Sequence, residues 1–168
     1  YDPETGKLFW LPRTSDLFQD GAKSAAHVCS YWNSRYAGTE AFTAVNKGYL
    51  YGSIFNVKIQ AHRAIWAIGY GVWPQLHIDH INGDKSDNRL NNLREATRSE
   101  NMSNCRIRSH NRSGFKGVAR SKFGRGWFAR ISIQGQSHYL GCFDTPEAAH
   151  NAYCIAARQY HGEFARTS

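Results

Sequence analysis

The metal-binding and proton-transferring side chains of this chain are most concentrated in one stretch, residues 76–93, Leu-His-Ile-Asp-His-Ile-Asn-Gly-Asp-Lys-Ser-Asp-Asn-Arg-Leu-Asn-Asn-Leu. Leucine and isoleucine side chains are spaced among polar ones over residues 75–81, which predicts a short, half-buried strand. Asn82-Gly83 follows, and this dipeptide favours the positive φ angles of a tight turn. The polar residues after the turn predict a solvated loop.

The sequence after that loop predicts a second strand and then a helix. Leu90, Leu93 and Ala96 mark the return of the chain toward the core. Thr97 is followed three residues later by Glu100, and this spacing is typical of a capping box at the start of a helix. We expect this helix to run from Ser99 to about Asn104. The whole region then reads strand, loop, strand, helix.

These residues carry side chains suited to the hydrolysis of a phosphodiester. The reaction needs an attacking water that loses a proton near neutral pH, and His80 is the natural base. It also needs a divalent cation, for which Asp79 and Asn101 offer the hard oxygen ligands that Mg²⁺ or Mn²⁺ prefers. Asn92 could accept a hydrogen bond from the other ring nitrogen of the base. His77 is a candidate for a secondary phosphate contact, although a structural or surface role fits it equally.

Periodicity alone does not bring these groups together, because alternation along a strand sends Asp79 and His80 to opposite faces. The spacing over residues 62–104, however, resembles the HNH homing-endonuclease family, in the branch of phage genomes and self-splicing introns whose third motif residue is Asn. The resemblance implies a ββα-metal fold with His80 as general base and Asn92 orienting it. It also implies one Mg²⁺ or Mn²⁺ ion on Asp79 and Asn101, and a monomer with one such site should nick DNA.

The N-terminal 60 residues are less informative. We expect short strands around a turn in residues 1–10, a brief helix at 22–32, and a hairpin from residues 48–54 and 57–60. Residues 61–69 have apolar side chains at helical spacing, and this helix resembles the one before the catalytic motif in the same HNH branch. Arg63 on it is a candidate for phosphate contact.

The net charge of +8 is concentrated in the last third of the chain, where residues 105–168 hold ten Lys or Arg and three Asp or Glu. A basic surface of this kind is typical of a module that binds a polyanion, and no basic amphipathic helix points to a membrane instead. We therefore expect double-stranded DNA as the partner. Residues 105–113 are basic, polar and aperiodic, which indicates a linker that follows DNA through Arg106, Arg108 and Arg112.

Periodicity changes after the linker. Residues 115–120, 127–133 and 137–143 are strand-like runs separated by turns that contain glycine. Thr145-Pro146 then opens a helix with a small-residue apolar face that Gly162 ends. These elements predict a three-stranded antiparallel sheet with one packed helix, so the fold class is α+β: a ββα-metal nuclease module followed by this sheet. The expected domains are 1–104 and 114–168, joined by the linker.

The segment 114–166 resembles the APETALA2/ethylene-response-factor DNA-binding domain, through Lys116-Gly117-Val118, residues 127–131, residues 140–145, Glu147-Ala148-Ala149 and residues 162–165. Residues matching the DNA-facing positions of that family, together with neighbouring cations expected at phosphates, are Lys116, Arg120, Lys122, Arg125, Arg130, Ser132, Ser137 and Tyr139. The chain has Ala119, Ser132 and Ser137 where the plant proteins use Arg, so their target sequence does not carry over. Alternation places Arg130, Ser132 and Tyr139 on the open face of the sheet.

The remaining expectations concern class and location. The four cysteines form no C-x-x-C pair, so we expect free, buried thiols and no structural zinc. No apolar run reaches the length of a membrane span, which favours a cytoplasmic protein, phage-encoded and acting in a bacterial host. We expect a monomer or weak dimer. The alternatives are a non-catalytic, sequence-specific DNA-binding regulator and, with no separate signal, an RNA nuclease or binder.

Overall fold

The computed structural model describes residues 1–107, 109–121, 124 and 126–167. The chain forms two compact units, each drawn from more than one stretch of sequence. Unit 1 contains residues 1–74 and 84–93, and unit 2 contains residues 75–83 and 94–168. The expected domain boundaries at residues 104 and 114 concern independent folding and stay a prediction.

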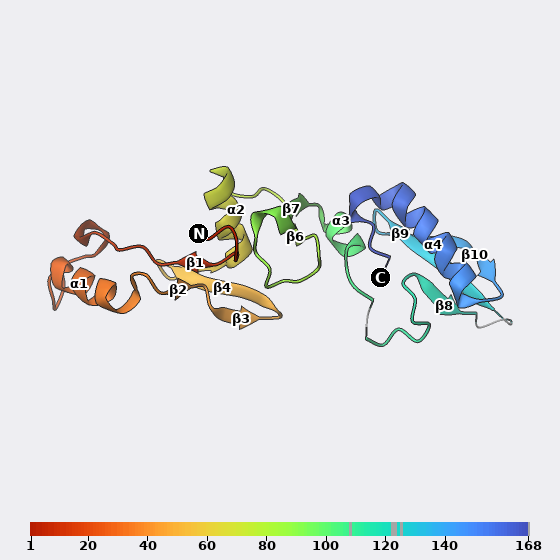
Figure 1. The fold of residues 1–168 in the computed structure, drawn as a ribbon, viewed down its shortest axis with the longest axis horizontal. Helices are drawn as coiled ribbons and strands as arrows, with labels where there is room; N and C mark the ends of the chain where they lie inside the picture. Colours follow the sequence, from red (N-terminus) through yellow and green to blue (C-terminus); the bar gives the residue numbers. More distant parts are fainter. Residues whose placement is uncertain (108, 122–123, 125, 168) are drawn as a thin grey trace. The chain divides into compact units, whose positions relative to one another are not determined.

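Unit 1 is built from small antiparallel sheets and two helices (Figure 1). Aromatic packing holds its N-terminal part, where the Trp10 ring contacts the rings of Trp32 and Phe42. The expected hairpin is present as β4 and β5. A third strand, β3, pairs with the other edge of β4, so that β4 lies between β3 and β5. The elements are β1 (Leu8–Phe9), η1 (Ser15–Leu17), α1 (Ala25–Tyr36), β2 (Glu40–Ala41), β3 (Ala44–Asn46), β4 (Tyr49–Ile54), β5 (Val57–Gln60), α2 (Ala61–Tyr70) and η2 (Leu90–Asn92).

Helix α2 buries the side chains that its periodicity predicted, including those of Ala61, Ala64 and Ile65. It ends at Gly71, whose φ of 71° is the left-handed conformation that glycine adopts without a steric cost. Gly69, inside the last turn, leaves room for the side chain of Leu90, which a methyl group there would strike. Packing against the 84–93 loop thus explains a glycine within the helix.

Unit 2 begins with strand β6 (His77–His80), which pairs with β7 (Leu93–Ala96) in a two-stranded sheet. Helix α3 (Arg98–Ser103) follows and packs against β6. The capping box is present: the Thr97 hydroxyl accepts from the Glu100 N–H, and the Glu100 carboxylate accepts from the Thr97 N–H at 2.7 Å. The predicted order of strand, loop, strand and helix is confirmed.

The second part of unit 2 is a three-stranded antiparallel sheet covered by one long helix (Figure 1). The strands are β8 (Val118–Arg120), β9 (Trp127–Ile133) and β10 (Gln136–Phe143), with β9 in the centre. Helix α4 (Pro146–His161) packs on one face, and the short η3 (Gly162–Phe164) follows it. The core consists of Val118, Ala129, Ile131, Ala149, Tyr153, Ala156 and Ala157.

Two details of this sheet differ from a regular ladder. Strand β8 starts at Val118 instead of Phe115, because Gly117 has a φ of 75° and lies directly under the ring of Tyr153. A β-bulge between Tyr139 and Gly141 shifts the register of β10 against β9. The expected alternation is otherwise confirmed, since Ala129 and Ile131 are buried while Arg130 and Ser132 are exposed.

None of the helices in the described part of the chain is long and apolar enough to cross a membrane.

Candidate active site

Asp79 lies near the end of β6 and is almost fully buried, with 4% of its surface exposed. Its Oδ2 accepts hydrogen bonds from Nε and Nη2 of Arg94, both at 3.0 Å. Both carboxylate oxygens also lie within 3.1 Å of the Asn104 side-chain nitrogen. A buried carboxylate is tolerated only with such partners, so Arg94 and Asn104 are what allow a charge at this position.

Asn104 was not predicted, although it contacts both residues of the Asp-His pair. Its Nδ2 donates to the backbone carbonyl of His80 at 2.8 Å as well as to Asp79. It is the residue that closes α3, and it is 8% exposed. The contact spans 25 residues, and an Asn at a helix end usually marks only a cap, so no local pattern indicates it.

His80 is the last residue of β6 and is as buried as Asp79. Its carbonyl accepts from the Gly83 N–H at 2.7 Å, which closes the Asn82–Gly83 turn. Gly83 has a φ of 70°, as the Asn-Gly signal predicted. The His80 carbonyl thus accepts two hydrogen bonds, one from Gly83 and one from Asn104. His77, at the other end of β6, is exposed.

Asn101 lies on α3, three residues before Asn104. Side chains three residues apart share one face of a helix, so Asn101 is on the same face as the residue that contacts Asp79. It is half-buried. Asn92 lies in unit 1, where its side-chain nitrogen donates to the Asp87 carbonyl at 2.7 Å and holds the 84–92 loop.

The predicted DNA-contacting residues lie in different surroundings. Arg130 pairs with Tyr139 across β9 and β10, and Ser132 pairs with Ser137, so these four exposed residues share the open face of the sheet. Arg120, Arg106 and Arg112 are exposed. Arg63, in unit 1, donates to the Pro74 carbonyl at 2.9 Å and stacks over Trp73. Arg108, Lys122 and Arg125 lie outside the described residues.

Lys116 differs from the other cations because it is half-buried. Its ammonium donates to the carbonyls of Ser103 and Cys105, at 2.6 and 2.7 Å, where α3 ends. Its pKa is lowered from the usual 10.5 to about 8, mainly by burial and to a smaller extent by the Arg166 charge, against an opposing effect of Cys105. Burial of the His161 ring, together with the charge of Lys116, lowers the pKa of His161.

Basic residues line two neighbouring grooves of unit 2. One, of about 810 Å³, runs along the linker and β8, and its cationic side chains are Arg106, Arg112, Lys116, Arg120 and Arg130. The other, of about 690 Å³, lies between α3 and β9 and includes Arg98. Lys116, Gly117, Arg130 and Met102 line both grooves, so they are continuous. Arg98 was not predicted to line a basic groove, because its position in the first turn of α3 indicates only the start of a helix.

Comparisons with known proteins bear on residues 60–103, which match the sequence profile of the HNH endonuclease. The chain is also 34% identical over 106 residues to Protein 3.8 of Escherichia phage T7, a match that covers 62% of this chain and 87% of the phage protein. This chain belongs to the HNH endonuclease family. The matched span contains Asp79, His80, Asn92 and Asn101.

A second relative carries the family in its name. The chain is 32% identical over 110 residues to the uncharacterized HNH endonuclease L560 of Acanthamoeba polyphaga mimivirus. The match covers 64% of this chain but 56% of the mimivirus protein, so the chain spans little more than half of that relative. Together these matches make this HNH protein a DNA nuclease. The HNH profile match ends at residue 103 and does not include the C-terminal half, to which the APETALA2 resemblance applies.

HNH nucleases generally use a divalent metal, and the donor chemistry at β6 fits one. In the described residues, Oδ1 of Asp79 accepts only from Asn104, whereas Oδ2 takes both bonds from Arg94. Oδ1 is therefore the carboxylate oxygen suited to a cation. No cluster of three His, Cys, Asp or Glu side chains that could hold a metal occurs in the described part of the chain. A donor set here would combine one carboxylate with carboxamide oxygens, the hard ligands that Mg²⁺ and Mn²⁺ accept.

Proposed function

We propose that this protein is a metal-dependent DNA endonuclease of the homing type that nicks one strand, with Asp79 and Asn101 holding the metal and His80 acting as general base. The observation that carries the proposal is the pair at the end of β6, where two adjacent ionisable residues are both buried and both fixed by Asn104. Structural residues seldom require two such groups in sequence, because burying each one has a free-energy cost.

His80 would take a proton from the attacking water. Histidine exchanges protons near neutral pH, and general bases of this kind accelerate reactions by about 10²–10⁴-fold. The water oxygen then bonds to phosphorus, and the bond to the 3′ oxygen breaks, leaving 5′-phosphate and 3′-hydroxyl ends. The orienting role of Asn92 that the family resemblance implies stays a prediction.

The metal would be one Mg²⁺ or Mn²⁺ ion on the Oδ1 side of Asp79 and the carboxamide oxygen of Asn101. When bound, it supplies positive charge that stabilises the negative charge developing on the phosphate. Asp79 and Asn101 come from two elements that pack together, β6 and α3. Arg94 keeps the carboxylate in one orientation by occupying Oδ2.

The C-terminal half would bind the double helix through an APETALA2-like sheet. Its support is the exposed face with Arg130, Ser132, Ser137 and Tyr139, bordered by the basic grooves of unit 2. Two-stranded and larger β surfaces of this size can enter a major groove. The linker arginines and Arg120 would contact phosphates, and Arg63 and His77 are secondary candidates. Arg108, Lys122 and Arg125 remain candidates on sequence grounds.

One active site per chain cuts one strand, so a monomer should release open-circular and not linear plasmid. Two cuts in one encounter would require a dimer. As a phage-encoded enzyme it would act in the cytoplasm of a bacterial host.

The test is the conversion of supercoiled plasmid by purified protein with Mg²⁺ or Mn²⁺, compared with EDTA. Open circle that accumulates before any linear product, and only with metal, is the expected result. Linear product from the first time point would contradict nicking. Tight plasmid binding without any cleavage in either metal would contradict the enzyme proposal and favour the DNA-binding regulator.

A further inference from the structure

The five residues after helix α4, Gly162–Arg166, reach back to the strand that carries the Asp-His pair. The connection passes through Arg94. While Nε and Nη2 of this side chain bind Asp79, its Nη1 donates to the Glu163 carbonyl at 2.9 Å and lies 3.6 Å from the Glu163 carboxylate. Its guanidinium also lies 3.7 Å from the centre of the Phe164 ring. Arg94 is thus held between the active-site carboxylate and the C-terminal segment.

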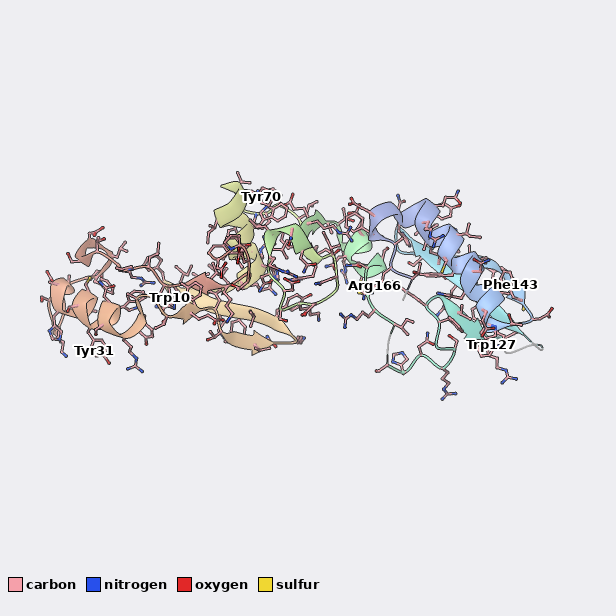
Figure 2. All side chains as sticks on the ribbon, in the orientation of Figure 1. Trp10, Tyr31, Tyr70, Trp127, Phe143 and Arg166 are labelled. Carbon is pink, nitrogen blue, oxygen red and sulfur yellow. The ribbon has the colours of Figure 1, made fainter. Side chains whose placement is uncertain are left out.

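A second contact joins the same segment to the turn after His80. Nη1 of Arg166 donates to the Asn82 carbonyl at 3.0 Å (Arg166 is labelled in Figure 2). The guanidinium covers Gly83, so a side chain at residue 83 would collide with it, and Arg106 lies close by on the same side. The turn that ends β6 is therefore backed by the C-terminal segment as well as by its own hydrogen bond.

The residues in these contacts differ in burial. The Arg94 side chain is 13% exposed and the Phe164 ring is buried, whereas the Glu163 carboxylate is 76% exposed and contributes mainly through its backbone carbonyl. A long Arg side chain loses much conformational freedom when it is fixed, and stacking on an aromatic ring offsets part of that loss. Without Phe164 and the Glu163 carbonyl, Arg94 could still pair with Asp79, but in several geometries.

We propose that Gly162–Arg166 is a positioning element of the nuclease site, acting through Arg94 on the Asp79 carboxylate and through Arg166 on the Asn82–Gly83 turn. The inference rests on the proposed function of Asp79. Its consequence is that the C-terminal half does more than bind DNA: the end of that half sets the geometry at which cleavage occurs. A change here should lower kcat while DNA affinity is unchanged.

The experiment compares Arg166→Gln and Phe164→Ala with Arg158→Gln, which removes the same charge from an exposed position on α4. Each variant is tested for DNA affinity in EDTA, for nicking rate at saturating DNA with Mn²⁺, and for amide hydrogen exchange over residues 77–83. Arg166→Gln and Phe164→Ala should lower the nicking rate by about 10–100-fold, because small misplacements of reacting groups have effects of this size. Both should also speed exchange in residues 77–83, with DNA affinity within about twofold of the parent.

Arg158→Gln should change neither rate nor exchange. Phe164→Ala is expected to lower overall stability, so Arg166→Gln, whose side chain is only half-buried, decides the matter. Unchanged exchange or an unchanged nicking rate in Arg166→Gln overturns the inference. The exchange measurement needs no activity, so if the parent protein fails to cleave with either metal, the proposed function fails on its own while exchange still tests the support of the turn.

Discussion

Strand β6 and the open face of β9 and β10 both carry residues that the sequence assigned to function, but their surroundings are opposite. Asp79 and His80 are buried and bonded on several sides. Arg130, Ser132 and Tyr139 are exposed, with Tyr139 at 67%. The first region has its geometry fixed before any substrate arrives, as a reacting centre requires. The second is solvated and adaptable, as expected of a surface that follows a DNA backbone.

His80→Ala tests the buried region most directly and should have the largest effect. Loss of the base should lower the nicking rate by about 10²–10⁴-fold, since that is what general bases contribute. Binding, measured by fluorescence anisotropy in EDTA, should stay within about twofold. His27→Ala, at an exposed position of α1, is the matched control and should cleave normally. Turnover by His80→Ala at the parent rate would show that another group activates the water.

Asp79→Asn should lower both the stability of the protein and the rate of cleavage. A substitution on the open face of the sheet should leave stability unchanged. The Asp79→Asn substitution removes the buried counter-charge of Arg94 and leaves the exposed Glu163 carboxylate, 3.6 Å away, as its remaining ion-pair partner. Breaking a fully buried pair has a free-energy cost of about 3–5 kcal/mol. We expect about 2–4 kcal/mol in urea unfolding, because Arg94 keeps some solvent contact, together with loss of nicking. An unfolding free energy equal to that of the parent would mean that the Arg94 pair contributes nothing net.

Arg130→Gln should change salt dependence and leave stability alone. If Arg130 contacts a phosphate, the slope of log affinity against log salt should fall by about one, with the nicking rate at saturating DNA unchanged. Arg158→Gln, on the far side of the sheet in α4, serves as control. A full salt slope in Arg130→Gln would exclude this sheet position from phosphate contact.

Lys116→Met has its diagnostic effect in the pH dependence of stability. Burial lowers the pKa of Lys116 from 10.5 to about 8, so between these values the unfolded chain holds a proton that the folded chain has released. Folding stability from this group therefore rises as pH increases through that window. The free energy of unfolding of the parent minus that of the variant, measured by urea unfolding, should increase from pH about 8 to about 10.5. A pH-independent difference would contradict the lowered pKa.

Much of the local structure was predictable because its signals are local. The capping box placed α3 within one residue, β9 has the predicted bounds, and Gly162 ends α4. Strand β8 starts late because tertiary packing of Gly117 under Tyr153 overrides the apolar pattern of the residues before it. The HNH spacing identified the family, and the comparisons confirm it.

The contacts around Asp79 were not predictable in the same way. Arg94 and Asn104 reach it across 15 and 25 residues, and Glu163 reaches Arg94 across 69. Hydropathy patterns report which face of an element is buried, but they do not report which polar groups meet there. Alternation even suggested that Asp79 and His80 diverge, whereas both are buried, because the strand ends at His80 and the chain turns immediately afterward.

The stacking of Arg94 on Phe164 has a consequence for protein engineering. A chimera that joins the HNH segment of this chain to a different fold would have to keep two separate pieces, because Phe164 and Arg166 contact Arg94 on β7 and the Asn82–Gly83 turn. Exchanging everything after residue 104 would discard these contacts together with the three-stranded sheet. Retargeting by module exchange therefore calls for grafting equivalents of Phe164 and Arg166 at the end of the incoming fold.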